Sequence, residues 1–531
     1  MKYVLLALSF LLISCSPSSS PVDLAIESKV FHYGNGTEPQ GLDPHIVTGV
    51  PEHHILIALC EGLTSSNPKG GAALPGMAES WSISDDGKTY TFNINKDARW
   101  SNGDKVTADD FVWSWNRVLT PSLGSQYTDM LYYVEGAKDF YDGNIDDFSQ
   151  VGVKAIDDNT LEVVLNNPTP FFLGLLSHYS TWPVHKDTVL KHGTIDDRNG
   201  QWTRPGNFVC NGPMQLKSWE LNNKIVVEKN PFYWDAQTVK LNEIHFYPVT
   251  NIMTEDRMFR AGQLHSTYTV PAQKCPVYIE EENPNLSITP YMGTYFYRTN
   301  TLNPALKDAK VRKALAYSIN REQIVKKVSQ CGQLPAFSFT PPGANGYEPE
   351  TEIPYDLDLA RELLAEAGFP NGEGFPVLEI LFNTSEDHRK IALAVQQMWQ
   401  SALGINVELV NMDWKVYLSR ESSGDFQISR AGWIGDYQDP KTFLDMMVSG
   451  RGNNKTGWSN LEYDRLLAKA AESTSQEERY GYLYEAEKIL IDELPIIPIY
   501  TYTRIYMKHE TVKGWEPNLL DSHAYQYISI E

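Results

Sequence analysis

The sequence predicts a multi-domain α/β protein, and three observations support this class. About 515 residues follow an N-terminal leader, which is too many for one hydrophobic core, so we expect two or three domains. Predicted helices and strands alternate from about residue 290 to 500, as in an α/β lobe. The segment from 60 to 185 is richer in hairpin signals. We therefore expect one α/β lobe next to at least one hairpin-rich domain.

The first fifteen residues, MKYVLLALSFLLISC, have the pattern of an export signal. Lys2 precedes an apolar run that is too short to span a membrane. The run ends in Leu12, Ile13, Ser14 and Cys15, which resembles a bacterial lipobox, so we expect Cys15 to be lipidated and to become the mature N-terminus. The alternative is an ordinary signal peptide that contains a cysteine. The following SPSSSP is typical of a flexible tether, and no later stretch is apolar enough to span a bilayer.

The hairpin-rich segment contains a clear turn and a capped helix. Asp86 and Gly87 predict a hairpin turn before a half-buried strand. The alternating apolar residues of that strand are Tyr90, Phe92 and Ile94. Thr107 is the expected N-cap of the next helix, with Asp110 in the capping-box position. The apolar face of this helix consists of Phe111, Trp115 and Val118.

Several predicted helices of the α/β lobe have recognisable start or stop signals. KDAKVRKALAYSINREQIVKKVS predicts two consecutive helices, the second capped by Asn320. DLDLARELLAEAGF is a helix that ends at Gly368, and HRKIALAVQQMWQSALG ends at Gly404 before the strand INVELV. A long amphipathic helix is predicted over EERYGYLYEAEKILIDELP. Pro495 ends this helix, and the apolar strand IIPIYTY follows.

Charge and cysteine content exclude several classes of protein. The formal net charge is −22, and so acidic a chain is repelled by nucleic acid and by anionic lipid surfaces. Beyond Cys15 the cysteines are widely spaced and form no CxxC motif, which excludes a zinc knuckle. They are Cys60, Cys210, Cys275 and Cys331. An exported chain permits disulfides in any of three pairings, or all four thiols stay free and buried.

The sequence contains no recognisable catalytic motif. GxSxG, HExxH, a P-loop and a G-x-G-x-x-G after a strand are all missing. His53 and His54 are adjacent, which suits neither one helix face nor one strand face for joint metal ligation, so we expect a surface pair. We predict no enzyme, no metal and no cofactor. An enzyme remains an alternative, because carboxylates assembled from distant positions leave no local pattern.

The stretch SRAGWIGDYQDPKTFLD, residues 429 to 445, has an unusual chemistry for a turn. DFQISRAGW predicts a strand that ends in a glycine-bearing turn. The simplest interpretation leaves Asp436 and Asp439 solvated there. The alternative is that this loop holds a ligand.

Four stretches resemble the dipeptide and oligopeptide solute-binding proteins that feed ABC importers, and most closely the periplasmic oligopeptide-binding proteins. They occur in the family's order and cover essentially the whole mature chain. They are GLDPHIVTGVPE, MAESWSISDDGKTYTFNINKDARWSNGDKVTADDFVWSWNRVL, VRKALAYSINREQIV and RAGWIGDYQDPKTFL.

This resemblance implies an α/β fold with two hinged lobes and three domains, of the peptide-binder type. The first lobe combines a non-contiguous base domain with an inserted domain, and the second lobe is the α/β lobe. The base domain is expected at 16–60, 187–291 and 503–531, the insert at 61–186 and the second lobe at 292–502. The chain crossovers near residues 290 and 502 are the expected hinge.

The resemblance also implies a site for peptides of many sequences. Asp436 matches the aspartate that binds the peptide's α-amino group. Backbone groups of Gly432 and Ile434 pair with the peptide as a strand does, and the opposite lobe offers the backbone of Thr48, Gly49 and Val50. Trp433 lines a side-chain pocket. The other implied contacts are Tyr127, Trp414 and Tyr502.

Arg430 and His388 match family positions that bind the ligand's carboxylate at different peptide lengths. A guanidinium suits this role because its fork holds a carboxylate in two places. Two alternatives stay open from the residues themselves. Arg430 pairs with an internal acid such as Asp425, and His388 lies on the surface.

The chain also departs from the family's pattern. A lysine that serves some ligand lengths is Ser329 here, and an arginine is Glu421, with Arg420 beside it but turned about a hundred degrees on a helix. Arg298 stands where close relatives have a glutamate. The two positions of a disulfide found in close relatives are Gly293 and Ile434 here, so that disulfide is absent.

We therefore expect an extracytoplasmic, monomeric receptor, lipid-anchored through Cys15, that delivers short peptides to an ABC permease. Alternatives are a murein tripeptide receptor for cell-wall recycling, a peptide sensor or chaperone without import, and relatives' other ligands such as nickel chelates or haem. The sequence does not determine the preferred peptide length and sequence, the permease, the disulfide pairing, or which membrane carries the anchor.

Overall fold

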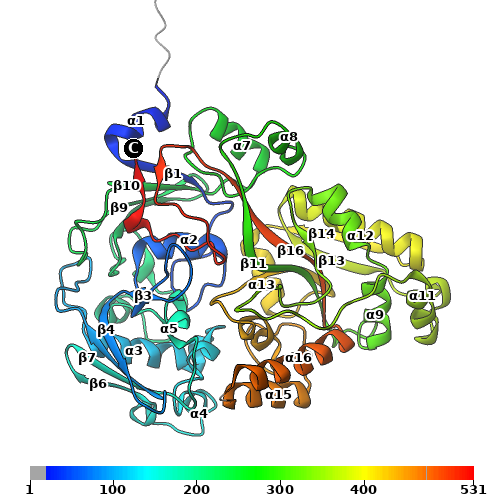
Figure 1. Cartoon of the computed structure of the whole chain (residues 1–531), viewed down its shortest axis with the longest axis horizontal. Coiled ribbons are helices and arrows are strands. Elements are labelled where there is room, and N and C mark those ends of the chain that lie inside the picture. The colour runs from blue at the N-terminus through cyan, green and yellow to red at the C-terminus, as the bar shows by residue number, and fades with distance from the viewer. Residues whose placement is uncertain (1–18, 474) are drawn as a thin grey trace, which may run out of the picture.

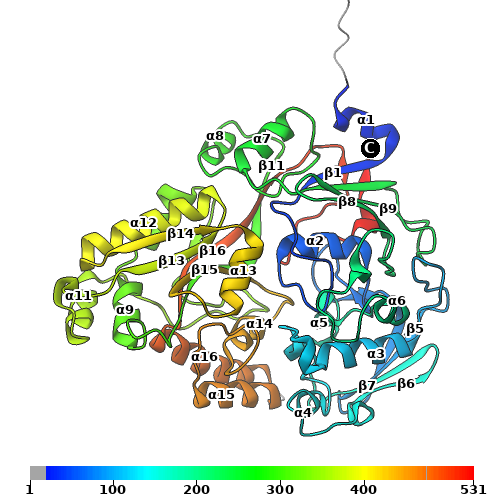
Figure 2. The same ribbon diagram turned by 180° about the vertical axis from the view of Figure 1, so that it is seen from behind.

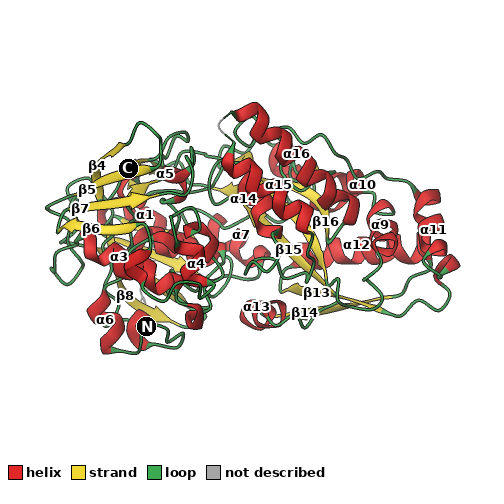
Figure 3. Cartoon of the chain, turned by 90° about the horizontal axis from the view of Figure 1, so that it is seen from below, coloured by secondary structure: helices red, strands yellow, loops and turns green. Residues whose placement is uncertain are grey.

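The computed structural model describes residues 19–473 and 475–531, which form two lobes side by side (Figure 1 and, from below, Figure 3). We define the first lobe as helices α1 to α8 with their two larger sheets, and the second lobe as helices α9 to α16 with the sheet that contains β11 and β16. The predicted leader and Cys15 lie outside the described residues.

One sheet of the first lobe brings together strands that are far apart in the chain. Its order is β1-β10-β9-β8, with β1 parallel to β10 and the other pairs antiparallel. The strands are β1 (Val30–Gly34), β8 (Met214–Glu220), β9 (Lys224–Lys229) and β10 (Glu243–Tyr247). Two short hairpins also occur, β2 (Thr64–Ser65) with β3 (Leu74–Pro75), and β17 (Val512–Lys513) with β18 (Ser529–Ile530).

The other sheet of the first lobe is the predicted hairpin-rich segment. Its antiparallel order is β4-β5-β7-β6. The strands are β4 (Ala78–Ile83), β5 (Thr89–Ile94), β6 (Val153–Asp157) and β7 (Thr160–Val164). The predicted turn at Asp86 and Gly87 is confirmed, since Gly87 has a φ of 71° between two paired strands. The predicted alternation is confirmed too, because Tyr90, Phe92 and Ile94 are buried.

The predicted capped helix of this lobe is confirmed. Helix α3 starts with a capping box in which the Thr107 and Asp110 side chains each bond the other residue's backbone. Its predicted apolar face is buried. The helices of the lobe are α1 (Pro21–Ser28), α2 (Val50–Leu59), α3 (Ala108–Leu119), α4 (Ala137–Tyr141), α5 (Phe172–Leu175), α6 (Lys186–Lys191), α7 (Ile252–Arg260) and α8 (Cys275–Glu280).

The second lobe is built on a mixed sheet with the order β12-β16-β11-β15-β13-β14. Its strands are β11 (Leu286–Thr299), β12 (Leu334–Pro335), β13 (Leu378–Asn383), β14 (Val407–Met412), β15 (Ile428–Ile434) and β16 (Ile496–Met507). Strand β14 confirms the predicted strand after Gly404, and β15 confirms the predicted strand before the turn.

Helices cover both faces of this sheet (Figure 2). One face packs on α9, α11 and α12, and the opposite face packs on the helices α14 to α16. The predicted helix ends at Asn320, Gly368 and Gly404 are confirmed; Gly404 is left-handed with a φ of 71°. The helices are α9 (Ala309–Tyr317), α10 (Arg321–Ile324), α11 (Leu357–Glu366), α12 (Glu386–Leu403), α13 (Trp414–Ser422), α14 (Lys441–Leu444), α15 (Leu461–Glu472) and α16 (Gln476–Glu493).

Strands β11 and β16 are long enough to belong to both lobes. Their outer halves pack on α7 and α8 through Ile288, Ile505 and Met507, while their inner halves lie in the core of the second lobe. The pairing of the two strands shifts register between Pro290 and Thr294. The two predicted crossovers, near 290 and 502, fall in these strands. The predicted domain boundaries and the hinge itself remain predictions.

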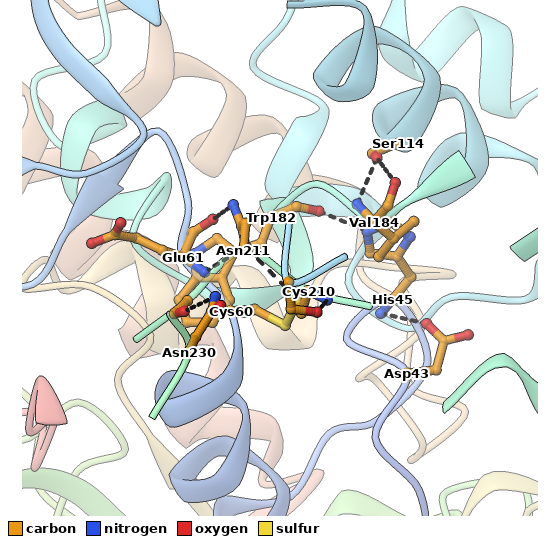
Figure 4. Close-up of a disulfide and its surroundings, with 12 residues drawn as sticks. Asp43, His45, Cys60, Glu61, Ser114, Trp182, Val184, Cys210, Asn211 and Asn230 are labelled. Atoms are coloured by element: carbon orange, nitrogen blue, oxygen red, sulfur yellow. Dashed lines mark hydrogen bonds between the residues drawn. A yellow bond between two sulfur atoms is a disulfide. The ribbon is translucent and has the colours of Figure 1, made fainter. Parts of the chain in front are cut away.

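Two disulfides settle the cysteine pairing that the sequence left open. Cys60 bonds Cys210 and Cys275 bonds Cys331, so the alternative of four free thiols is wrong. Cys60 follows the last residue of α2, and the Asn211 side chain holds the adjacent backbone by accepting from the Glu61 N–H at 3.0 Å and donating to its carbonyl at 2.9 Å (Figure 4). This disulfide therefore fixes the C-terminal end of α2.

We expect loss of either disulfide to lower the free energy of unfolding by about 2 to 5 kcal/mol, because a crosslink restricts the unfolded chain. The Cys60–Cys210 bond spans 150 residues and the Cys275–Cys331 bond spans 56. The double Ala variant at Cys60 and Cys210 should therefore lose about 1 kcal/mol more than the variant at Cys275 and Cys331. Urea titrations of both variants measure this, and the reverse order would contradict the chain-entropy explanation.

Candidate functional site

A cleft between the two lobes contains two adjoining cavities of about 140 and 290 Å³. Both cavities share one stretch of wall, which comes from the start of α2, from β11, from α13 and from β15. The shared residues are Thr48, Gly49, Val50, Tyr291, Trp414, Arg430, Gly432 and Ile434. Asp436 lines the first cavity and His388 lines the second. The two cavities thus form one passage that runs along β15.

Strand β15 turns a free edge toward this passage. On one side it pairs with β11 along its whole length, whereas its pairing with β13 stops at Ser429. The Gly435 N–H donates to the Met292 carbonyl at 2.8 Å, which fixes the phase of the antiparallel ladder. Because hydrogen-bonded residues alternate in such a ladder, the N–H and C=O groups of Gly432 and Ile434 point away from β11. They are available to an added strand.

Side chains approach the backbone closely at two glycines of the passage wall. A side chain at Gly432 would put its first carbon 2.5 Å from the Tyr502 hydroxyl, and one at Gly49 would lie 2.1 Å from the Glu52 carboxylate. Both contacts are far shorter than van der Waals distance, so a side chain at either position would force Tyr502 or Glu52 to move.

Gly293 and Ile434, which stand where close relatives have a disulfide, are partners in the β11–β15 ladder. The Ile434 side chain fills the space over Gly293, because a first side-chain carbon built there would lie 2.4 Å from Ile434 Cδ1. Packing in the sheet therefore holds β15 at this point.

Asp436 lies immediately after β15, and its side chain is only 10% exposed, so the interpretation as a solvated turn residue is wrong. The Thr442 hydroxyl is 3.3 Å and the His178 Nε2 is 3.4 Å from its carboxylate. Burial raises the pKa of Asp436 well above its usual range and lowers the pKa of His178 well below its own. Among the described residues, the carboxylate is thus contacted by neutral donors and lacks a cation.

Arg430 points from β15 into the passage with neutral partners. Its Nη2 donates to the Tyr502 hydroxyl at 2.7 Å, and its guanidinium lies 4.8 Å from the centre of the Tyr295 ring. The alternative pairing with Asp425 is wrong, because Asp425 accepts from Arg420. Within the described ranges Arg430 forms no ion pair, and its Nε is buried without a hydrogen-bond partner. The guanidinium therefore keeps capacity for an anionic group.

His388, in the first turn of α12, lies beside Arg430. Its ring centre is 5.6 Å from that of Tyr295, and its buried Nδ1 has no partner among the described residues. Burial, followed by the charge of Arg430, lowers the pKa of His388 well below its usual range. The surface alternative is wrong, and the imidazole is a neutral group that can donate or accept in the second cavity.

The aromatic residues expected at the site all line the cleft. Tyr127 and Trp433 come from opposite lobes and their ring centres are 6.2 Å apart. Trp414 begins α13, and its indole N–H lies 3.4 Å from the Glu52 carboxylate of the first lobe. Tyr502, on β16, holds Arg430. The structure thus brings together every residue that the resemblance implied.

The prediction for the paired histidines is wrong. His54 is buried rather than on the surface, with its Nδ1 3.3 Å from the Tyr33 hydroxyl and its Nε2 3.6 Å from Asp521. Both His53 and His54 line the first cavity. Sequence periodicity missed this because both faces of α2 are covered, one by its own lobe and one by the closed cleft.

Several cleft residues carried no sequence signal. His178, Tyr417, Asn453 and Lys455 line the first cavity but come from segments without a motif. Ser329, by contrast, lines neither cavity, and its hydroxyl donates to the Val325 carbonyl.

The described residues show neither a cluster of metal ligands nor a membrane-spanning helix. Residues 19–473 and 475–531 contain no group of three or more His, Cys, Asp or Glu side chains arranged to hold a metal ion. None of their helices combines the length and the apolar character that crossing a membrane needs.

Direct contacts hold the lobes together beside the cleft. Arg451 of the second lobe donates to Asp129 of the first at 2.7 Å, and the Tyr133 hydroxyl donates to Asp445 at 2.7 Å. Arg451 and Asp129 are each only 17% exposed. Other contacts between the lobes are the stacked rings of Phe171 and Tyr437 and the bond from Asn453 to the Gln126 carbonyl. These contacts join side chains or backbone of the two lobes, so they form only when the lobes are close together.

Comparisons with known proteins agree on the family. Residues 72–455 match the family model of bacterial extracellular solute-binding proteins, family 5 (Middle). The chain is 38% identical to the periplasmic oligopeptide-binding protein OppA of Salmonella typhimurium, over 91% of this chain and 88% of that protein. It is also similar to the structure of Haemophilus influenzae OppA in complex with the peptide RPPGFSPFR, with a TM-score of 0.90, 34% identity and coverage of 95% and 99%.

Two structures of one relative indicate how the lobes are placed. The murein tripeptide-binding protein MppA of Escherichia coli is 34% identical to the chain and gives a TM-score of 0.90 over 94% of this chain and 98% of that one. The unliganded open form of MppA gives 0.64 over 95% and 98%. The lobes of this chain therefore lie as in the first MppA structure and in the peptide complex of Haemophilus influenzae OppA, and unlike those of the open form.

We expect Arg451→Met to shift the ligand-free protein toward an open state. A hydrogen bond to a charged group contributes about 1.5 to 3 kcal/mol, so losing the bond to Asp129 should raise the ratio of open to closed molecules roughly tenfold to a hundredfold. Small-angle scattering should show a larger radius of gyration.

The matched control is Arg465→Met, which removes an exposed pair with Glu462 inside α15 of the same lobe. Equal radii for the two variants would contradict the role of Arg451.

Proposed function

The chain belongs to family 5 of the bacterial extracellular solute-binding proteins, and on this premise we propose that it is a receptor for short peptides that serves an ABC importer. It binds the backbone and the charged ends of the peptide in the cleft between its lobes. The relatives named above are oligopeptide-binding and murein tripeptide-binding proteins, which supports a peptide as the ligand.

Two ionisable side chains of the cleft, Asp436 and Arg430, support a peptide ligand most directly. The cleft buries an acidic group, Asp436, and a basic group, Arg430, and neutral side chains surround each of them. Burying an unpaired charge is unfavourable, so each group favours a ligand group of opposite sign. A peptide with free ends carries an ammonium and a carboxylate at a separation set by its backbone. The ammonium therefore binds at Asp436, and the carboxylate binds at Arg430 or, in a longer peptide, further along at His388.

The free edge of β15 explains how one site accepts many sequences. Gly432 and Ile434 offer backbone groups to the peptide, and Thr48, Gly49 and Val50 face them from the first lobe. Backbone hydrogen bonds are common to all peptides, so they contribute affinity without selecting side chains. Aromatic walls from Tyr127, Trp433 and Trp414 leave room for varied side chains and water.

Peptide binding is coupled to closure of the lobes. The ligand contacts both lobes, so it binds the closed state more tightly and shifts the population toward it. Strands β11 and β16 connect the lobes and are the elements that absorb the motion. The closed form then presents both lobes to the permease in a fixed arrangement.

We place the receptor outside the cytoplasmic membrane, as a monomer without catalytic activity, held there by a lipid on Cys15. The apolar leader that ends in Leu12, Ile13, Ser14 and Cys15 supports the anchor, and the periplasmic relatives support the compartment. A short tether leaves the cleft free to meet peptide and permease.

We expect Asp436→Asn to weaken binding of a peptide with a free N-terminus by a hundredfold to several-thousandfold. Leaving one member of a buried ion pair unpaired costs about 3 to 5 kcal/mol. N-acetylation of the peptide removes the same charge, so wild type should discriminate strongly between free and acetylated peptide and the variant much less. Calorimetric titration of both proteins with both peptides gives the coupling energy.

The control for this cycle is Asp425→Asn, which changes an exposed aspartate just before β15 and should leave both affinities unchanged. A coupling energy near zero would defeat the assignment of Asp436.

We expect Cys15→Ala to release the protein from the membrane fraction while its peptide affinity stays within twofold of wild type, because the anchor and the cleft are separated by a tether. Fractionation of cells and titration of the released protein test the two halves of this statement. A variant that stays in the membrane fraction would show that another feature holds it there.

A further inference from the structure

Three charged side chains meet on the wall of the first cavity, away from the groups assigned to the peptide's ends. Arg298 comes from the end of β11, Glu421 from α13 and Lys455 from the segment before α15. Arg298 Nη1 donates to Glu421 Oε1, and Lys455 Nζ lies 3.3 Å from Glu421 Oε2. We call these three residues the charged cluster. Their side chains are 6%, 3% and 8% exposed, so bulk water screens their charges only weakly.

Glu421 is fully occupied within the charged cluster. Besides the two cations, its Oε1 accepts from the Tyr417 hydroxyl at 2.8 Å and from the Ser429 hydroxyl at 3.2 Å. The cations lower the pKa of this carboxyl to about 2 against the opposing effect of burial, so it is ionised at any physiological pH. One anion therefore faces two cations, and the charged cluster keeps one positive charge in excess.

The cations also keep unused hydrogen-bond donors. Arg298 Nε is buried without a partner among the described residues, and its Nη2 has only the Met446 sulfur, at 3.9 Å. For Lys455, one of three ammonium hydrogens is used, by Glu421. A buried cation with free donors is unfavourable unless an acceptor arrives. Because these groups line the cavity, a bound ligand can supply that acceptor.

We propose that the charged cluster is a subsite for a side-chain carboxylate, so that the receptor prefers peptides with Asp or Glu near the N-terminus. This inference rests on the proposed function. The position follows from the cavity that the cluster lines, which also contains Asp436, whereas His388 lies in the other cavity. A lysine or arginine side chain is disfavoured there, because it meets the excess positive charge.

A peptide with glutamine in place of glutamate separates the effect of charge from that of shape. A glutamine side chain has nearly the shape of glutamate and accepts hydrogen bonds, but it does not neutralise the excess charge. The ratio of affinities for glutamate and glutamine peptides therefore measures the charge preference with little contribution from shape.

Calorimetric titration of the mature protein tests the proposal with tetra-alanine and with its single Glu, Gln and Lys substitutions at the first three positions. At one of these positions we expect Glu to bind at least tenfold more tightly than Gln, and Lys more weakly than Gln. Lys455→Met removes the excess charge and should reduce the Glu preference to threefold or less. Lys455→Arg keeps the charge and should restore it.

Two controls separate the subsite from other effects. Lys488→Met removes an exposed lysine of α16 in the same lobe and should leave the preference unchanged. C-terminal amidation of the glutamate peptide should also leave it unchanged, since the proposed contact is with a side chain. If amidation abolished the preference, the cluster would hold the terminal carboxylate and the proposal would be wrong.

The titrations give different results if the subsite alone is wrong and if the receptor function is wrong as well. Tight binding of tetra-alanine with equal affinities for the Glu and Gln peptides would overturn the subsite and leave the peptide receptor intact. A Glu preference that survives in Lys455→Met would also overturn it. If wild type bound none of the peptides, both the receptor function and the subsite would be wrong.

Discussion

The structure depends on one electrostatic constraint: a closed cleft buries an acidic side chain, Asp436, and a basic one, Arg430, without pairing them to each other. Asp436 and Arg430 both belong to β15 or the turn after it, yet each side chain contacts neutral groups. Such an arrangement is unfavourable in the empty closed state and favourable once a zwitterionic ligand is enclosed. The same burial that raises the pKa of Asp436 makes its carboxylate sensitive to a bound ammonium. In the proposed function, the free energy gained by enclosing the charges of the ligand also favours closure of the lobes.

The scaffold holds Asp436 and Arg430 in place from both lobes. The ladder with β11 holds β15 on one side and leaves its other edge free beyond Ser429. On the facing lobe, the Cys60–Cys210 disulfide fixes the far end of α2. The near end of this helix begins at Val50, directly after Thr48 and Gly49. The second disulfide joins α8 to the segment before β12, and the Thr503 hydroxyl of β16 donates to the Cys331 carbonyl at 3.0 Å. The cleft walls of both lobes are thus held in place, and strands β11 and β16 connect the two lobes.

The chain departs from the family's pattern at positions on the wall of the first cavity. Two departures that look unrelated in the sequence, Arg298 and Glu421, are ion-pair partners in the structure. Lys455 joins them and leaves the cluster positively charged. Backbone recognition is insensitive to such exchanges, since it uses groups that every residue has. Specificity can therefore change in this fold without loss of general peptide binding.

The sequence by itself determined the local structure and the family. Caps at Thr107 and Asn320, glycines after helices and the alternation in β5 depend on neighbours within a few residues, so their predictions are confirmed. Resemblance also identified part of the cleft lining, such as Asp436 and Arg430, but not His178 or Lys455. Only the tertiary structure decided the disulfide pairing, the burial of His54 and Asp436, and the free edge of β15. The charged cluster belongs to the same class, because its members lie more than thirty residues apart. Long-range contacts set the solvation and the partners of these groups, and no local pattern in the sequence encodes them.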